Sequence, residues 1–119
     1  MKTILLVEDE FGIAGVLTVL LEDAGYRVLS AGNGREGLEQ LAANRPNVVV
    51  TDYMMPLMDG AAMARAIRAD PAFQDIPIIM MTSVREDIVR QHFAGYTAYM
   101  RKPFQTEVLL DLIARIAES

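Results

Sequence analysis

Short apolar runs alternate along this chain with longer stretches whose apolar residues recur at helical spacing. Three runs, at 3–7, 47–51 and 76–82, consist mainly of Ile, Leu, Val and Met. Such continuous runs are typical of strands that are buried on both faces of a parallel sheet. Two more strands are predicted at 27–31 and 97–101, and the mixed composition of 97–101 indicates an edge strand.

Amphipathic stretches separate the predicted strands. Apolar residues at 13, 17, 20 and 21 lie on one side of a predicted helix that ends before Gly25. Five strand–helix units in series predict an α/β fold: a five-stranded parallel sheet with right-handed crossovers and helices on both faces. The other helices are predicted at 36–43, around Met63 and Ile67, at 86–94, and from Thr106 to the end of the chain.

Composition narrows the class of protein. A chain of 119 residues is the size of one domain, so we expect 1–119 to fold as a unit. The absence of Cys excludes disulfides and thiolate metal sites. A net charge of −5 argues against a direct nucleic-acid interface, which needs a basic face. Because no apolar run is long enough to span a membrane and no signal peptide precedes the first strand, we expect a cytoplasmic protein without membrane contact.

Charged and polar side chains stand at the ends of four predicted strands. Glu8 and Asp9 follow the first strand, and Asp52 follows the third. Thr82 ends the fourth strand, and Lys102 follows the fifth. Since ligands of parallel α/β sheets bind outside the carboxyl ends of the strands, we expect these five side chains to converge.

The expected cluster is rich in carboxylates, and two carboxylates about 4 Å apart repel by roughly 4 kcal/mol at an effective dielectric of about 20. Without His or Cys, such a cluster suits a hard divalent cation, above all Mg²⁺. Lys102 and the Thr82 hydroxyl would then be placed to contact a phosphoryl group on Asp52, because Asp is a covalent phosphoryl acceptor in other proteins. The alternative is that the acidic residues 8–10 only complement a helix N-terminus, as Asp59 does for the third helix.

Five short motifs follow one another along the whole chain. They are Glu8-Asp9 after the first strand, Asp52 after the third, Met55-Pro56-Leu57-Met58-Asp59-Gly60, Thr82-Ser83 after the fourth and Lys102-Pro103-Phe104 after the fifth. Each motif is weak alone, but the five in this order are highly specific, and together they resemble those of bacterial response-regulator receiver domains of the CheY-like type. The resemblance implies a flavodoxin-like (βα)5 fold with strand order 2-1-3-4-5, and a cis Lys102–Pro103 bond.

The same resemblance implies a role for each site residue. Asp52 would accept a phosphoryl group from the phosphohistidine of a sensor histidine kinase or a histidine phosphotransfer protein. Asp9, Asp52 and the backbone carbonyl of Met54 would hold Mg²⁺, and Glu8 would act mainly through water. Lys102 would pair with the phosphoryl oxygens.

Two more residues would transmit the change. The resemblance implies that Thr82 moves toward the phosphoryl group and that Tyr99 changes rotamer with it, although ordinary packing roles would also suit both side chains. A downstream effector protein would then read the surface of the fourth helix, fifth strand and fifth helix. The protein would be a signalling switch rather than an enzyme, either monomeric or forming a weak phosphorylation-dependent dimer.

Other functions on this fold stay open. A Mg²⁺-dependent aspartyl-phosphate hydrolase would need a second Asp two residues after the first, where this chain has Met54. A flavin- or nucleotide-binding module would need small residues after the first strand, where acidic residues stand. A degenerate receiver would be a constitutive binding surface. For a phosphorylated receiver, apolar Met54 and Val84 predict slow loss of the phosphoryl group, because neither can orient an attacking water.

Overall fold

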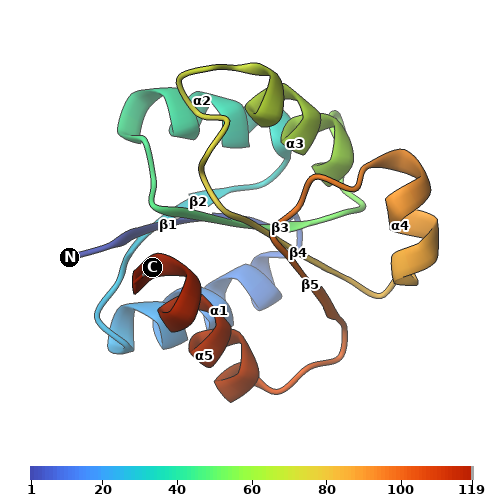
Figure 1. Ribbon diagram of the computed structural model, residues 1–119. Helices are drawn as coiled ribbons and strands as arrows, with labels where there is room; N and C mark the ends of the chain where they lie inside the picture. Colours follow the sequence, from blue (N-terminus) through green and yellow to red (C-terminus); the bar gives the residue numbers. More distant parts are fainter. Residues whose placement is uncertain (119) are drawn as a thin grey trace.

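The computed structural model describes residues 1–118, which form one sheet of five parallel strands with helices on both faces (Figure 1). The strand order, β2-β1-β3-β4-β5, confirms the order that the family resemblance implies. The strands are β1 (Thr3–Val7), β2 (Arg27–Ala31), β3 (Val48–Asp52), β4 (Ile78–Thr82) and β5 (Ala98–Arg101). The helices are α1 (Phe11–Asp23), α2 (Gly34–Asn44), α3 (Gly60–Ala69), α4 (Glu86–His92) and α5 (Thr106–Glu118).

Two apolar cores lie on opposite faces of the sheet. Helices α1 and α5 cover one face of the sheet, and α2 and α3 cover the other. Helix α4 lies at the end of the sheet that carries β4 and β5 (Figure 1). Because successive strand residues point to opposite faces, Ile4 and Leu6 enter the core under α1 and α5, and Leu5 and Val7 enter the other. This double burial explains the continuous apolar run of β1. Among residues 1–118 no helix has the length and apolar character needed to cross a membrane.

Three strands differ in their bounds from the predicted ranges, and hydrogen bonding explains the later starts of β4 and β5. Strand β4 begins at Ile78 rather than at 76, because Pro77 has no N–H group to donate and the Ile76 N–H bonds to a turn carbonyl. Strand β5 begins one residue later than predicted, since Thr97 uses its hydroxyl to accept the Ile78 N–H. Strand β3 is displaced by one residue, which makes Asp52 its last member, paired with Met81 of β4.

Two helices also differ from their predicted ranges, and α2 ends at Asn44, one residue later than predicted. Helix α2 begins at Gly34 rather than at 36, because the Asn33 side chain caps it by accepting the Glu36 N–H. Helix α4 ends at His92 rather than at 94, because Phe93 has an extended backbone. The single His, His92, is exposed as the last residue of α4.

Candidate functional site

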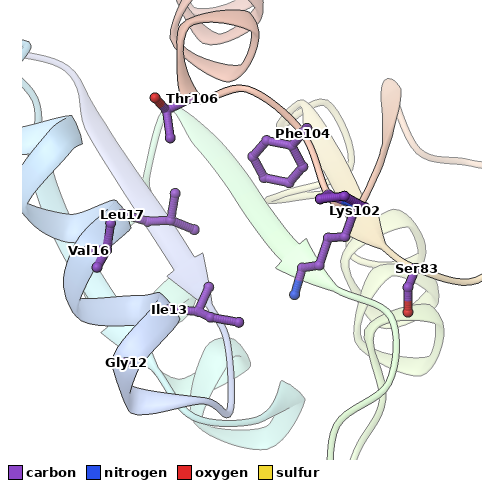
Figure 2. A pocket seen from close by; sticks show the side chains of 9 residues that line it. Gly12, Ile13, Val16, Leu17, Ser83, Lys102, Phe104 and Thr106 are labelled. Carbon is purple, nitrogen blue, oxygen red and sulfur yellow. The ribbon is translucent and has the colours of Figure 1, made fainter.

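Side chains from three strand ends meet at the carboxyl end of the sheet. The Lys102 ammonium lies 2.8 Å from Oε1 of Glu8 and 2.9 Å from Oδ2 of Asp52. Carboxylate oxygens of Glu8, Asp9 and Asp52 all lie within 4.8 Å of one another. Figure 2 shows Lys102 reaching from the segment after β5 over the end of β3. The predicted convergence of these charged residues is therefore what the fold produces.

Backbone groups fix the orientation of the Asp52 carboxylate. Its Oδ1 accepts the N–H of Tyr53 at 2.6 Å and faces the N–H of Met54 at 3.4 Å. Its Oδ2 faces Lys102, so each oxygen has its own donor. The carboxylate is consequently held at the site mouth, with the residue 9% exposed.

The loop after β3 packs so closely that residue 60 must be Gly. The Gly60 N–H donates to the carbonyl of Tyr53 at 2.8 Å, and a Cβ at this position would lie 2.1 Å from the backbone oxygen of Asp52. Asp59 caps α3, as predicted, by accepting the Ala62 N–H at 2.8 Å. Helix α3 thus begins directly against the residue that carries the site carboxylate.

Burial and charge shift two ionisable groups of the cluster. Glu8 is 3% exposed, and this burial, with the nearby Asp52 carboxylate, raises the pKa of Glu8 although Lys102 acts in the opposite direction. Burial alone would lower the pKa of Lys102, but its hydrogen bonds to Glu8 and Asp52 outweigh burial and raise it. Lys102 therefore stays charged, while ionisation of Glu8 is less favourable here than in water.

The oxygen donors fit a hard divalent cation. Three carboxylates share one region, and Asp9 is exposed while Glu8 is buried, so an ion would meet the cluster from the solvent side. Mg²⁺ prefers carboxylate and carbonyl oxygens and keeps several of its own waters. The part assigned to the Met54 carbonyl stays a prediction.

The two expected switch residues contact the same short segment, the loop between β4 and α4. Thr82 is buried at the end of β4, and its hydroxyl accepts the N–H of Val84 at 3.2 Å. The Tyr99 hydroxyl donates to the carbonyl of Val84. The Lys102 N–H donates to the carbonyl of Thr82 at 2.9 Å, which ties this segment to the charged cluster. Thr82 and Tyr99 therefore both bond to the backbone of Val84. Sequence reasoning did not identify this shared contact.

An apolar groove of about 560 Å³ adjoins the cluster. It lies between α1 and the segment that joins β5 to α5, with Val16 on one side, Phe104 on the other and Lys102 at its inner end (Figure 2). The outer surface of α1 continues this apolar character, because Phe11 is 92% exposed and Val16 is 60% exposed. Apolar surface of this kind beside a charged site is typical of an interaction face.

Comparison with known proteins decides the family. Residues 4–114 match the response regulator receiver domain family. The chain belongs to that family. The cis Lys102–Pro103 bond and the strand order of this receiver agree with what the sequence resemblance implied. It is a receiver domain of the kind used in two-component signalling.

Relatives of this receiver occur in several kinds of signalling protein. The phosphate regulon transcriptional regulatory protein PhoB of Pseudomonas aeruginosa is 35% identical over 117 residues, which are 97% of this chain and 50% of that protein. The receiver domain of a signal transduction histidine kinase from Syntrophus aciditrophicus has a TM-score of 0.92 at 33% identity and covers 99% of this chain and 91% of that one. The receiver thus spans about half the length of the curated regulator that it matches.

A third relative was solved with metal in place. The receiver domain of sensor histidine kinase PA1611 from Pseudomonas aeruginosa has a magnesium ion coordinated in its active site cleft. It is 30% identical, has a TM-score of 0.90 and covers 99% of this chain and 98% of that one.

Besides the contact at Val84, sequence reasoning missed two features of the receiver site. The direct bond between Glu8 and Lys102 was not predicted, because Glu8 was expected to act mainly through water. The tight contact at Gly60 was also missed, although a Gly directly after a helix-capping Asp is a signal that could have suggested it.

Proposed function

We propose that this receiver is a phosphoryl-accepting switch whose acceptor is Asp52. A carboxylate oxygen attacks the phosphorus of a phosphohistidine, the P–N bond breaks as the P–O bond forms, and the imidazole leaves. The donor would be a sensor histidine kinase or a histidine phosphotransfer protein. The observation that carries the proposal is the fixed Asp52 carboxylate, with backbone N–H groups on one oxygen and the Lys102 ammonium on the other.

Phosphoryl transfer needs mainly correct positioning of the reacting groups and neutralisation of their charge. This chain has residues suited to both tasks. Glu8, Asp9 and Asp52, with the backbone carbonyl of Met54, would hold Mg²⁺, and the ion when bound would neutralise developing negative charge. Lys102 supplies a second positive charge directly at Asp52. The backbone donors of Tyr53 and Met54 keep the carboxylate oriented without any rearrangement.

The signal would leave the site through Thr82 and Tyr99. A phosphoryl group offers new acceptor oxygens, so the Thr82 hydroxyl would exchange its bond with the Val84 N–H for one to the phosphoryl group. Tyr99, which donates to the Val84 carbonyl, would change its rotamer with that movement. The change would alter the α4–β5–α5 surface, and an effector protein with different affinity for the two forms would read it.

The groove beside α1 gives the donor a place to dock. A protein that brings a phosphohistidine to Asp52 must cover the mouth of the site, and the apolar groove leads there. We propose that an apolar helix surface of the donor covers Val16 and its neighbours on α1. The net charge of −5 favours protein partners over nucleic acid. A cytoplasmic location and a weak phosphorylation-dependent dimer stay predictions.

The residue two positions after the acceptor favours a switch over a hydrolase. Met54 is apolar and 63% exposed, so it offers no acid or base for rapid turnover of the acyl phosphate. We infer that the domain stores the phosphoryl group rather than turning over a substrate.

Intact mass measurement tests the proposal. Wild type and Asp52→Asn are incubated with Mg²⁺ and acetyl phosphate, and we expect one labile phosphoryl group on wild type alone. An equal adduct on both proteins would mean that the acceptor is another residue. No adduct on wild type, with Mg²⁺ binding measured separately, would favour a constitutive binding surface instead.

A further inference from the structure

Thioethers are the sulfur groups that an oxidant meets in this receiver. The chain has no Cys, so no thiol competes for the oxidant, but it has eight Met residues. A Met thioether is oxidised to the sulfoxide, which is polar, and the change is reversible. Which of the eight is modified by a mild oxidant depends on how far each side chain is exposed.

The eight Met residues differ widely in exposure. Met55 and Met58 are half-buried against the core under α2 and α3. Among residues 1–118 the largely exposed ones are Met1, at 92%, and Met54, at 63%. A dose of oxidant that spares the core should therefore modify Met54 first, together with the N-terminal residue. The remaining four are at most 7% exposed: Met63, Met80, Met81 and Met100.

Met54 lies beside the residue that carries the site carboxylate. It follows Asp52, the last residue of β3, by two positions, and its backbone N–H faces Oδ1 of Asp52 at 3.4 Å. It also lines a surface hollow of about 220 Å³ together with Tyr53, Met55 and Asp59. Because a Met side chain has three rotatable bonds and this one is largely exposed, its sulfur can reach water that lies next to a group on Asp52.

We propose that Met54 is a site of reversible oxidation by hydroperoxides, and that its sulfoxide shortens the lifetime of the phosphorylated receiver. The sulfur lone pair attacks one oxygen of hydrogen peroxide, and the S–O bond forms as the O–O bond breaks. A proton passes from the attacked oxygen to the departing one, which leaves as water. Sulfur loses two electrons and the peroxide gains them. This inference rests on the proposed function, because it needs a phosphoryl group on Asp52.

The sulfoxide changes what residue 54 offers to water. A thioether is only a weak hydrogen-bond acceptor, whereas the sulfoxide oxygen is polar and accepts from a water beside the acyl phosphate. That water attacks the phosphorus, the P–O bond to Asp52 breaks, and inorganic phosphate leaves while the carboxylate is restored. Since a sulfoxide orients the water but takes no proton from it, we expect the phosphoryl group to be lost about three- to ten-fold faster, below the roughly 10²–10⁴-fold effect of a general base.

Peroxide treatment of matched variants tests the proposal. Wild type, Met54→Leu and Met55→Leu are treated with hydrogen peroxide, which catalase then removes, and peptide mapping gives the oxidation at each Met. Leu and Met have similar volumes, so both substitutions keep the apolar packing. Treated and untreated samples are phosphorylated with Mg²⁺ and acetyl phosphate, and intact mass follows the loss after the donor is removed. Treatment should accelerate the loss in wild type and Met55→Leu, and leave the rate of Met54→Leu as it was.

Enzymatic reduction separates the sulfoxide from other damage. Methionine sulfoxide reductases, one for each sulfoxide epimer, return the thioether. Treated wild type should regain its original lifetime once the map shows Met54 reduced. A lifetime that stays short after Met54 is reduced would mean that the effect arises elsewhere, and it would overturn the inference.

Other results would also overturn it while leaving the proposed function standing. They are an unmodified Met54 at a dose that oxidises Met1, an oxidised Met54 with an unchanged or longer lifetime, and equal acceleration in Met54→Leu. In all of these, untreated wild type still takes up one phosphoryl group. If untreated wild type takes up none, the proposed function fails, and this inference fails with it.

Discussion

The Lys102 ammonium lies 2.9 Å from Oδ2 of Asp52, although 50 positions separate the two residues in the sequence. The same ammonium bonds Glu8 at 2.8 Å. One cation thus faces a cluster of three carboxylates, and this excess of negative charge determines how the site should respond to substitution, to pH and to Mg²⁺.

Replacing Lys102 should destabilise the domain, and Mg²⁺ should restore part of the loss. Lys102→Ala leaves the carboxylates of Glu8 and Asp52 without their partner. Removal of one partner costs about 3–5 kcal/mol in fully buried pairs, and the partial exposure of this site reduces our expectation to about 1–3 kcal/mol. Urea unfolding with and without Mg²⁺ measures the loss of stability. Lys2→Ala, at an exposed position, is the control. Equal stability of the two variants would contradict the expectation.

Glu8→Gln should reveal a pH dependence with a defined sign. The pKa of Glu8 in the folded protein is raised above its ordinary value of 4.5, so the folded state holds this proton more tightly than the unfolded state. Wild-type stability relative to Glu8→Gln should therefore fall as pH rises from about 4.5 through the raised pKa. Metal-free urea unfolding at several pH values tests this, with the exposed Glu39→Gln as control. A difference that stays constant with pH would refute it.

Much of the fold could be predicted from the sequence because its signals are local. The apolar runs of β1, β3 and β4 reflect burial on both faces, and the capping Asp59 marks a helix start. The strand-end positions of Asp52 and Lys102 were sufficient to predict convergence, since parallel strands end on one side. The strand order came from the family resemblance rather than from the pattern.

What could not be predicted depends on distances between segments. The Glu8–Lys102 bond joins residues 94 positions apart, and no local pattern specifies which carboxylate a lysine will choose. The bond of the Tyr99 hydroxyl to the Val84 carbonyl depends on how the loop between β4 and α4 packs beside β5, and the tight approach at Gly60 depends on where α3 begins. The late start of β4 followed from the missing N–H of Pro77, a signal that was present but not used.

Gly60→Ala should disturb both stability and the acceptor. A Cβ at Gly60 would lie 2.1 Å from the Asp52 backbone oxygen, so the strand end must shift. We expect a loss of about 1–3 kcal/mol or more, as for other overpacked positions, together with slower phosphorylation by acetyl phosphate. Gly15→Ala is the matched control, because nothing lies within 4 Å of a Cβ there and Ala favours helix by about 1 kcal/mol. Equal stabilities would contradict the steric argument.

Met54→Asn should shorten the lifetime of the phosphorylated form. Met54 lies two residues after Asp52, is largely exposed and cannot orient water. An amide there can hold a water near the acyl phosphate. We expect the phosphoryl group to be lost on the order of ten-fold faster, which is less than the roughly 10²–10⁴-fold rate increase that a well-placed general base gives. Intact mass over time after removal of the donor gives the rate. An equal or slower loss than wild type would refute the idea, and Met54→Leu serves as the apolar control.

Val16→Glu should separate transfer from a protein donor and transfer from a small one. Val16 is 60% exposed on α1 and lines the groove that ends at Lys102, without belonging to the charged cluster. A carboxylate there would be desolvated under an apolar donor surface, so transfer from a phosphorylated histidine phosphotransfer protein should slow by about ten-fold or more. Phosphorylation by acetyl phosphate, which needs no docking surface, should match wild type. Thr18→Glu, a partly buried position on the same helix outside the groove, controls for added charge. If transfer from both donors slows equally, the substitution has damaged the site itself. If transfer from neither donor slows, the protein donor does not bind over this face of α1.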